Sequence, residues 1–257
     1  MPDEVRRAFV WMVGSLASVR LLLASEYWSR TLYQIAIPVE DPLFPQVLRD
    51  PLVLLLAALG PLSVELIGMW RPTVSKMRMA AAVEIVSGAV LLIHQASFYK
   101  ATWVVIFWCG WFLAWLAWTA VRKPDLIRPC GPLLAQAIVA YFFLGGAVGK
   151  WTAGYWSGEV FQDILFRQHP GMVYQYLRTT FSESTLWQMA VIYSRTIVLV
   201  ETAMVGIVFV PARVASVLIG LVSLGLWGSS STLYEIAFPL IGLAAAAWFL
   251  SDSPRIG

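Results

Sequence analysis

The sequence predicts an all-α integral membrane protein, a polytopic bundle of about eight transmembrane helices. Hydrophobic residues make up 59% of the 257 residues and charged residues only 13%, whereas roughly 25% of a soluble domain is charged. Apolar runs such as "WVVIFWCGWFLAWLAWTAV" reach the roughly 20 residues that a helix needs to cross the hydrocarbon core. The net charge of +3 is spread along the chain without a basic cluster, which argues against a nucleic-acid partner.

Eight segments are predicted to span the membrane. In chain order they are 8–25, 51–70, 79–98, 101–121, 132–149, 186–210, 213–228 and 232–250. The first superficially resembles a signal peptide, but Arg20 interrupts its apolar core and no small-x-small cleavage site follows. We therefore predict that it is a retained first helix. The polar stretch "WGSSS" separates the last two spans.

Proline and capping residues indicate where several of these helices start. Pro51, Pro124 and Pro132 precede or open apolar runs, and proline is tolerated in the first turn of a helix. Thr185 followed by Gln188 fits a capping box at the start of the sixth span.

The distribution of lysine and arginine predicts the orientation. The short loops 71–78 and 122–131 are densely basic, and basic loops stay on the cytoplasmic side. With eight spans, both termini are then cytoplasmic and the long connections 26–50 and 150–185 lie on the outer face. Apolar residues at helical spacing predict a short amphipathic helix in the second connection, and "PGMVYQYLRTTF" predicts another. The residues of the first are Trp156, Val160, Phe161, Ile164 and Leu165.

Ionisable residues inside the spans are the candidates for a functional site. Such groups are costly in a membrane and face the bundle interior, paired or functional. Several fall toward the outer ends of their spans, which predicts a polar cavity opening outward. The ionisable residues are Arg20, Glu65, Glu84, His94, Lys150, Arg195, Glu201 and Glu235.

Structural roles are the alternatives for these residues. Lys150 can snorkel to the interface, and His94 can be a hydrogen-bonded buried histidine. Arg195 can form an ion pair between helices, with Glu235 or Glu201 as its partner. Glu84 can pair with a cytoplasmic arginine or lysine.

Established catalytic and metal-binding patterns are missing from the sequence. There is no GxSxG, HExxH or phosphate-binding loop. Cys109 and Cys130 have no metal-ligand spacing, and the one intramembrane histidine, His94, cannot ligate a haem pair. We therefore expect neither metal nor haem. No inverted repeat indicates a transporter.

The run "LLAQAIVAYFFLGGAVGKWTAGYWSGEVFQDIL" resembles the horizontally transferred transmembrane (HTTM) domain, which is the membrane part of vitamin K-dependent gamma-glutamyl carboxylase and its bacterial relatives. The family pattern is a helix with glutamine and aromatic residues, a small-residue step, a lysine, and then tryptophan and glycine. "HQASFYKATWVVIFW" resembles the family's histidine-bearing stretch, and "IVLVETAMVGIVFV" carries Glu201 at the matching place. The residues that match the first run are Gln136, Tyr141, Gly146, Lys150, Trp156 and Gly158.

The resemblance implies a single HTTM-like domain over residues 1–257, in a bacterial-type inner membrane. It gives Lys150 the role of a base and His94 that of an electrostatic partner, acting on a quinone-like or lipid substrate. Gln95 can also claim the histidine position, and Trp227 stands where the family has a further histidine. The remaining candidates for lining the cavity are Arg20, Gln136, Tyr141, Trp156, Arg195, Glu201 and Glu235.

Two functions stay open at this point. The first is an enzyme or redox module that acts on or binds a quinone or lipid. The carboxylase's large soluble part is missing, so carboxylation of protein glutamate by this chain alone is not expected. The second is an accessory or assembly subunit of a larger respiratory or electron-transfer complex, as in the distantly similar DoxX-like group. Its partners would be membrane lipids and other membrane subunits, packed on small-residue stretches such as "GGAVG" and "LIGLVSLGLWG".

Overall fold

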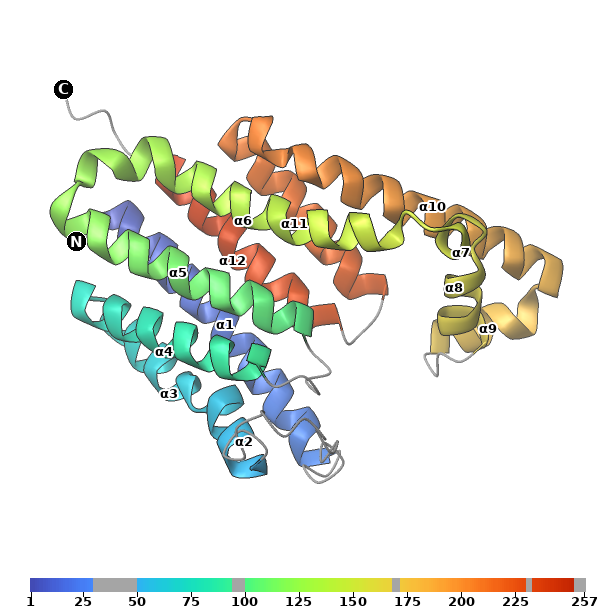
Figure 1. The fold of residues 1–257 in the computed structure, drawn as a ribbon, viewed down its shortest axis with the longest axis horizontal. Helices are drawn as coiled ribbons and strands as arrows, with labels where there is room; N and C mark the ends of the chain where they lie inside the picture. Colours follow the sequence, from blue (N-terminus) through green and yellow to red (C-terminus); the bar gives the residue numbers. More distant parts are fainter. Residues whose placement is uncertain (30–49, 94–99, 168–171, 230–232, 252–257) are drawn as a thin grey trace. The chain divides into compact units, whose positions relative to one another are not determined.

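The computed structural model describes residues 1–29, 50–93, 100–167, 172–229 and 233–251. These residues are helical and contain no strand, which confirms the all-α class (Figure 1). Six segments are long and apolar enough to cross a membrane, as expected of a multi-pass membrane protein. They are Asp3–Ala24, Leu52–Trp70, Ala101–Arg122, Pro124–Lys150, Glu183–Phe209 and Tyr234–Ser251.

The chain forms two compact units. The first comprises Met1–Val139 with Val208–Gly257, and the second comprises Ala140–Ile207. The first unit contains α1 (Asp3–Ser29), α2 (Pro51–Leu59), α3 (Pro61–Trp70), α4 (Val74–Ile93), α5 (Lys100–Arg122), η3 (Pro124–Leu126), the start of α6 (Ile127–Lys150), α11 (Ala212–Ser229) and α12 (Tyr234–Ser251). The second contains the end of α6, α7 (Ala153–Trp156), α8 (Glu159–Phe161), η4 (Gln162–Arg167), α9 (Met172–Thr180) and α10 (Glu183–Val205), and η5 (Gly206–Phe209) follows.

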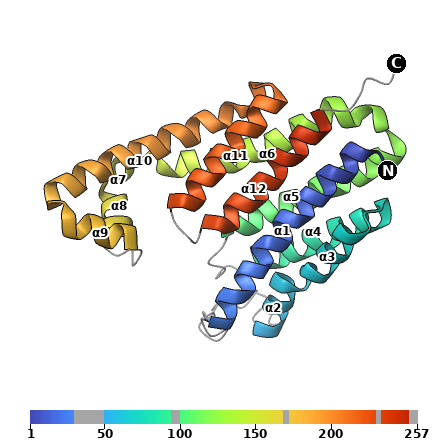
Figure 2. The same cartoon turned by 180° about the vertical axis from the view of Figure 1, so that it is seen from behind.

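Long helices pack in pairs in the first unit. α1 lies along α12 and α4 lies along α5, while α3 contacts both α1 and α4 (Figures 1 and 2). Glycines allow α4 and α5 to approach closely: a Cβ at Gly88 would lie 2.9 Å from the Cβ of Phe107, and one at Gly110 would lie 2.9 Å from the backbone nitrogen of Ile85. Close backbone contact of this kind stabilises helix pairs in lipid, where burial of apolar surface contributes little.

Helix occupies each of the eight predicted spans over the described residues. The span 51–70 is two helices, because Gly60 and Pro61 separate α2 from α3. Residues 94–98 of the third span lie outside the described residues. α4 is not among the six segments above because it contains three charged residues, Lys76, Arg78 and Glu84. α11 is not among them because its apolar stretch, Ala212–Gly228, is shorter than the six.

The predicted helix starts are partly right. Pro51 opens α2, where the side chain of Asp50 accepts the Leu52 N–H at 2.8 Å, and Pro124 opens η3. Pro132 lies inside α6, which starts earlier than predicted, at Ile127. The predicted cap at Thr185 is also wrong: Ser182 caps α10 and accepts the Thr185 N–H at 3.3 Å, because this serine stands first in the polar run.

Short helices occupy the described part of the connection after Lys150, as predicted. Phe166, Leu186 and Ala190 form a small apolar cluster against which Tyr174 of α9 packs. The opposite side of α9 is exposed, with Met172 85% accessible. Gly158 joins α7 to α8 with a φ of 82°, and a Cβ there would lie 2.7 Å from the backbone nitrogen of Val191. Both the left-handed backbone and the close approach therefore require glycine at this position.

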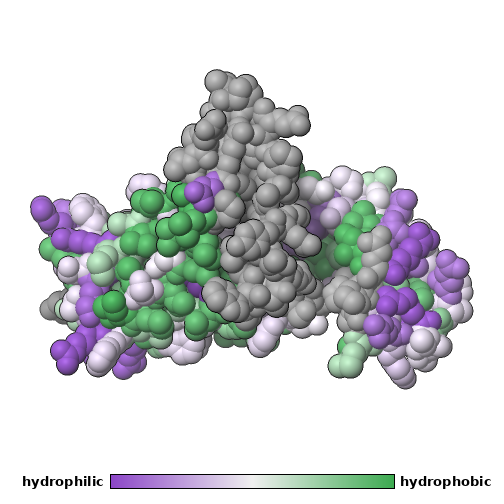
Figure 3. Space-filling view, turned by 90° about the horizontal axis from the view of Figure 1, so that it is seen from below, coloured by the Kyte–Doolittle hydropathy of each residue, from purple (hydrophilic) through white to green (hydrophobic). Residues whose placement is uncertain are grey.

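Large hydrophobic side chains are exposed along the spanning helices. On α2 and α3, Leu52, Leu56, Leu66, Ile67 and Trp70 are all exposed. Figure 3 shows a broad hydrophobic area on one face of the molecule. A soluble monomer rarely exposes so much apolar surface, which is compatible with helices that contact lipid.

Candidate functional site

An ion pair between Lys150 and Glu201 is the centre of the candidate site in the second unit. Lys150 is the last residue of α6, and Glu201 lies in α10. The ammonium Nζ lies 2.5 Å and 2.7 Å from the two carboxylate oxygens. The Lys150 side chain is 23% exposed and that of Glu201 is 10% exposed. Because water screens such a pair poorly, its attraction exceeds that of a surface salt bridge.

Gly146 makes room for the carboxylate. It lies one helical turn before Lys150, and a Cβ at this position would meet Oε2 of Glu201 at 2.8 Å. The contact with Glu201 therefore explains why one position of "GGAVGK", Gly146, is a glycine. Gly145 and Gly149 differ, because no other side chain of their own unit lies within 4 Å of a Cβ built there.

Two tryptophans lie beside the ion pair along the chain. The indole Nε1–H of Trp151 donates to Oγ1 of Thr202 at 3.0 Å, and Trp151 packs edge-to-face on Trp156 with ring centroids 5.1 Å apart. The Arg195 guanidinium lies 5.7 Å from the centre of the Trp156 ring, and its Nε–H donates to the Trp156 carbonyl at 3.1 Å. These contacts fix flat apolar surfaces next to a charged group.

Tyr155 belongs to the same group of side chains, although sequence reasoning missed it. Its carbonyl accepts the Ser194 hydroxyl at 2.5 Å, which ties α7 to α10. Burial raises the pKa of the Tyr155 phenol, and the negative charge of Glu201 raises it further. The phenol therefore stays neutral at physiological pH and keeps its O–H as a donor. The only sequence signal was its position beside Trp156 in "GYW".

The chemical capability of the pair follows from its charges. An ammonium group has three N–H donors and no lone pair, so Lys150 in this state binds an acceptor oxygen rather than accepting a proton. The Glu201 carboxylate is the group of the pair that can accept a proton or a hydrogen bond. Together, the two side chains can bind a head group that has both donor and acceptor atoms. Among the described residues, no cluster of three or more His, Cys, Asp or Glu side chains could hold a metal ion.

The other predicted site residues are divided between the units. Gln136 is buried in the first unit and donates from Nε2 to the Val210 carbonyl at 2.8 Å. Glu235, also buried there, accepts the Thr102 hydroxyl at 3.2 Å. Tyr141 belongs to the second unit and is 55% exposed. His94 and Gln95 lie outside the described residues.

The predicted ion pair of Arg195 with Glu201 is wrong, whereas the alternative pair with Glu235, which belongs to the first unit, stays a prediction. Glu201 pairs with Lys150, and Arg195 contacts Trp156. The helical spacing of α10 explains this outcome, because Arg195 is exposed whereas Glu201 is buried on another side of the helix.

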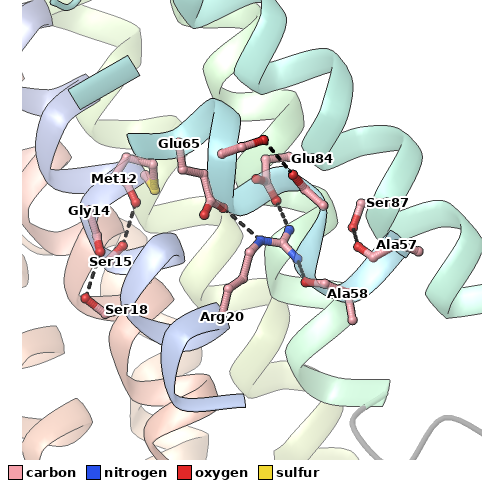
Figure 4. Close-up of polar contacts among 12 residues, drawn as sticks. Met12, Gly14, Ser15, Ser18, Arg20, Ala57, Ala58, Glu65, Glu84 and Ser87 are labelled. Atoms are coloured by element: carbon pink, nitrogen blue, oxygen red, sulfur yellow. Dashed lines mark hydrogen bonds and ion pairs between the residues drawn. The ribbon is translucent and has the colours of Figure 1, made fainter. Parts of the chain in front are cut away.

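Arg20 forms a second polar cluster, in the first unit, with two glutamates (Figure 4). Its Nε–H donates to Oε1 of Glu65 at 2.8 Å, and its Nη2 donates to Oε2 of Glu84. The Nη1 group donates to the carbonyl of Ala58. The predicted pairing of Glu84 with a cytoplasmic cation is therefore wrong. α4 begins at Val74 rather than 79, which brings Glu84 to the middle of its helix and level with Arg20.

Comparison of the chain with models of known families, with curated proteins and with solved structures finds no match.

Proposed function

We propose that this chain is an HTTM-like protein that binds the polar head of a quinone-like or lipid molecule at the Lys150–Glu201 pair. The observation that carries the proposal is a charged pair, only partly open to solvent, at the end of an apolar helix. Trp151 and Trp156, which follow Lys150 in the chain, hold each other edge to face, and Trp151 bonds to Thr202, the residue after Glu201. A ligand oxygen would accept from the Lys150 ammonium, and the ring of the ligand would pack on the indoles. The resemblance of "YFFLGGAVGKW" to the HTTM pattern supports the same lysine.

The proposal includes eight spans with both termini in the cytoplasm of a bacterial-type cell, which puts Lys150 at the outer face of the inner membrane. α4 and α11 are then spans as well. Support for α4 comes from the pairing of its charged midpoint residue Glu84 with Arg20, since a paired charge is tolerated inside a bundle. The basic loops 71–78 and 122–131 support the orientation.

Catalysis would require a proton shift within the pair. The resemblance gives Lys150 the role of base, and a lysine must be a neutral amine before it accepts a proton. The proton on Nζ would move to the Glu201 carboxylate, leaving an amine and a carboxylic acid. Binding needs no such step, so we propose binding first and chemistry only if this shift occurs in the occupied site.

Native mass spectrometry of gently solubilised protein tests the proposal. Wild type is compared with Lys150→Ala and with Arg167→Ala, which breaks an exposed ion pair with Asp163 in the same unit. A quinone or lipid adduct in wild type and Arg167→Ala that is lost in Lys150→Ala is the expected result. An adduct retained in equal amount by Lys150→Ala would contradict it.

A second candidate function, a non-catalytic accessory or assembly subunit of a larger membrane complex, is favoured by one observation. A Cβ built at any of several glycines would have no neighbouring atom of its own unit within 4 Å. They are Gly220, Gly225 and Gly228 on α11, and Gly145 and Gly149 on α6. Such faces allow close approach of a partner helix. A membrane subunit that co-purifies in fixed ratio, and is lost when these glycines are replaced by leucine, would favour this function.

A further inference from the structure

Two glutamates share one edge of the Arg20 guanidinium. The Nε–H and the neighbouring Nη2–H of an arginine point in parallel, and a single carboxylate commonly fills this edge with both of its oxygens. Here Nε bonds to Oε1 of Glu65 and Nη2 bonds to Oε2 of Glu84. The two carboxyl groups are therefore held side by side, where two negative charges repel each other strongly.

The cluster has one cation for two acids, and none of its members reaches solvent. Arg20, Glu65 and Glu84 are each 0% exposed. If both glutamates were ionised, the cluster would carry one uncompensated negative charge in an apolar bundle, and such a charge is expensive to bury. A buried carboxyl group in this position escapes the cost by holding a proton.

Among the described residues, no second cation forms an ion pair with the cluster. α2 has no ionisable side chain in its sequence "PLVLLLAAL". On α5 the group that faces Glu84 is the Cys109 thiol, which carries no positive charge. The Lys76 ammonium on α4 donates to the Ile67 carbonyl. Among the described residues, Arg20 is therefore the one cation bonded to the two carboxyl groups.

Each glutamate has one buried oxygen with no hydrogen-bond partner among the described residues. These atoms are Oε2 of Glu65 and Oε1 of Glu84. Buried polar atoms are nearly always satisfied, and an exception calls for an unseen proton, water or ion. A proton on either oxygen would convert it from an acceptor into a donor.

The break between α2 and α3 fixes the geometry of the cluster. Pro61 has no N–H to offer the carbonyl of Ala57 four residues earlier, and this carbonyl instead accepts the Ser87 hydroxyl at 2.5 Å. The next carbonyl, of Ala58, accepts from Arg20. Residues of three helices thus hold the guanidinium that α1 carries: Ala58 of α2, Glu65 of α3 and Glu84 of α4 (Figure 4).

We propose that Arg20, Glu65 and Glu84 form a proton-binding site inside the helix bundle. One proton adds to Oε2 of Glu65 or Oε1 of Glu84, forming an O–H bond that points to the other carboxyl group, while both bonds to Arg20 remain. The loaded cluster is neutral. Carboxyl groups in such settings are the elements from which intramembrane proton relays are built, and this site is independent of the head-group site at Lys150.

Infrared spectroscopy of the purified protein tests the proposal, because a protonated carboxyl has a carbonyl band that is separate from the amide bands and shifts in deuterium oxide. The measurement uses the Glu235→Gln background, which removes another buried carboxyl. The expected result at neutral pH is a band worth one carboxyl group, lost with either Glu65→Gln or Glu84→Gln. The matched control, Asp163→Asn, removes an exposed carboxylate that has its own cation in Arg167 and should leave the band unchanged.

The outcomes that overturn the proposal are equally direct. No deuterium-sensitive band in the folded Glu235→Gln protein would show that both glutamates are ionised. A band that disappears when sodium is added would identify a metal cation, rather than a proton, as the occupant. If the Gln variants do not fold, the Glu235→Gln protein is labelled with carbon-13 glutamate. A band that shifts on labelling comes from a glutamate carboxyl, as proposed, and a band that does not shift would contradict the proposal.

Discussion

The Cβ position of Gly146 lies 2.8 Å from Oε2 of Glu201, so the carboxylate occupies the space that any other residue at 146 would fill. Gly146 and Lys150 are one helical turn apart on α6. The glycine leaves space for the Glu201 carboxylate and the lysine binds it, so the two residues together position Glu201.

Gly146→Ala should therefore destabilise the protein. The added methyl group must displace the Glu201 carboxylate, and overpacking of this kind costs about 1–3 kcal/mol. Thermal unfolding in detergent measures the effect. Gly149→Ala is the control, because no side chain of its unit lies near that position and alanine favours helix. Equal melting temperatures for the two variants would contradict the geometry.

The Lys150–Glu201 pair should show strong coupling in a double-mutant cycle. Lys150→Met leaves a mostly buried carboxylate without its cation, and breaking a buried pair costs about 3–5 kcal/mol. The double variant Lys150→Met/Glu201→Gln removes both charges and should recover most of that loss. Denaturant unfolding of the four proteins gives the coupling energy. Additive losses would mean that the two side chains act independently.

Arg20→Met should be among the most damaging single substitutions. It leaves Glu65 and Glu84 buried without their cation, at a cost of about 3–5 kcal/mol. The yield and melting temperature of the purified variant measure this effect. Arg6→Ala is a matched control, since its pair with Asp3 is exposed and such pairs contribute at most about 1 kcal/mol. A fully stable Arg20→Met protein would contradict the observed cluster.

Ser87→Ala tests the helix break at Gly60 and Pro61. Without the hydroxyl, the partly buried Ala57 carbonyl loses its donor, and leaving such a carbonyl unsatisfied costs about 1 kcal/mol or more. The melting temperature should therefore fall. Ser63→Ala removes an exposed hydroxyl bonded to the Gly60 carbonyl at the same break and should have little effect. Equal losses in both variants would refute a specific role for Ser87.

The helices could be predicted from the sequence because apolar runs and their flanking prolines are local features. The candidate residues could also be named, since Arg20, Lys150 and Glu201 are ionisable groups within apolar runs. Their partners could not be predicted. Which acid meets which cation depends on the rotation and depth of helices far apart in the chain, and Arg20 meets Glu65 and Glu84 across 45 and 64 residues.

Small local features decided other differences. The capping serine, Ser182, lies three residues before the predicted cap because "SEST" offers several polar side chains. Gly60 and Pro61 split a span whose hydropathy is continuous. Tyr155 joins the Lys150 site through the short helix α7, and no spacing rule in the sequence connects it to Glu201.

Photo-crosslinking is the most direct test of the Lys150–Glu201 site. Wild type, Lys150→Ala and Arg167→Ala are exposed separately to a photoreactive quinone analogue and a photoreactive phospholipid, and the labelled peptides are mapped. We predict label from one of the two probes on residues 150–156 in wild type and Arg167→Ala, and its loss in Lys150→Ala. Label spread over helices outside this site, such as α11, in the same pattern for all three proteins, would contradict it.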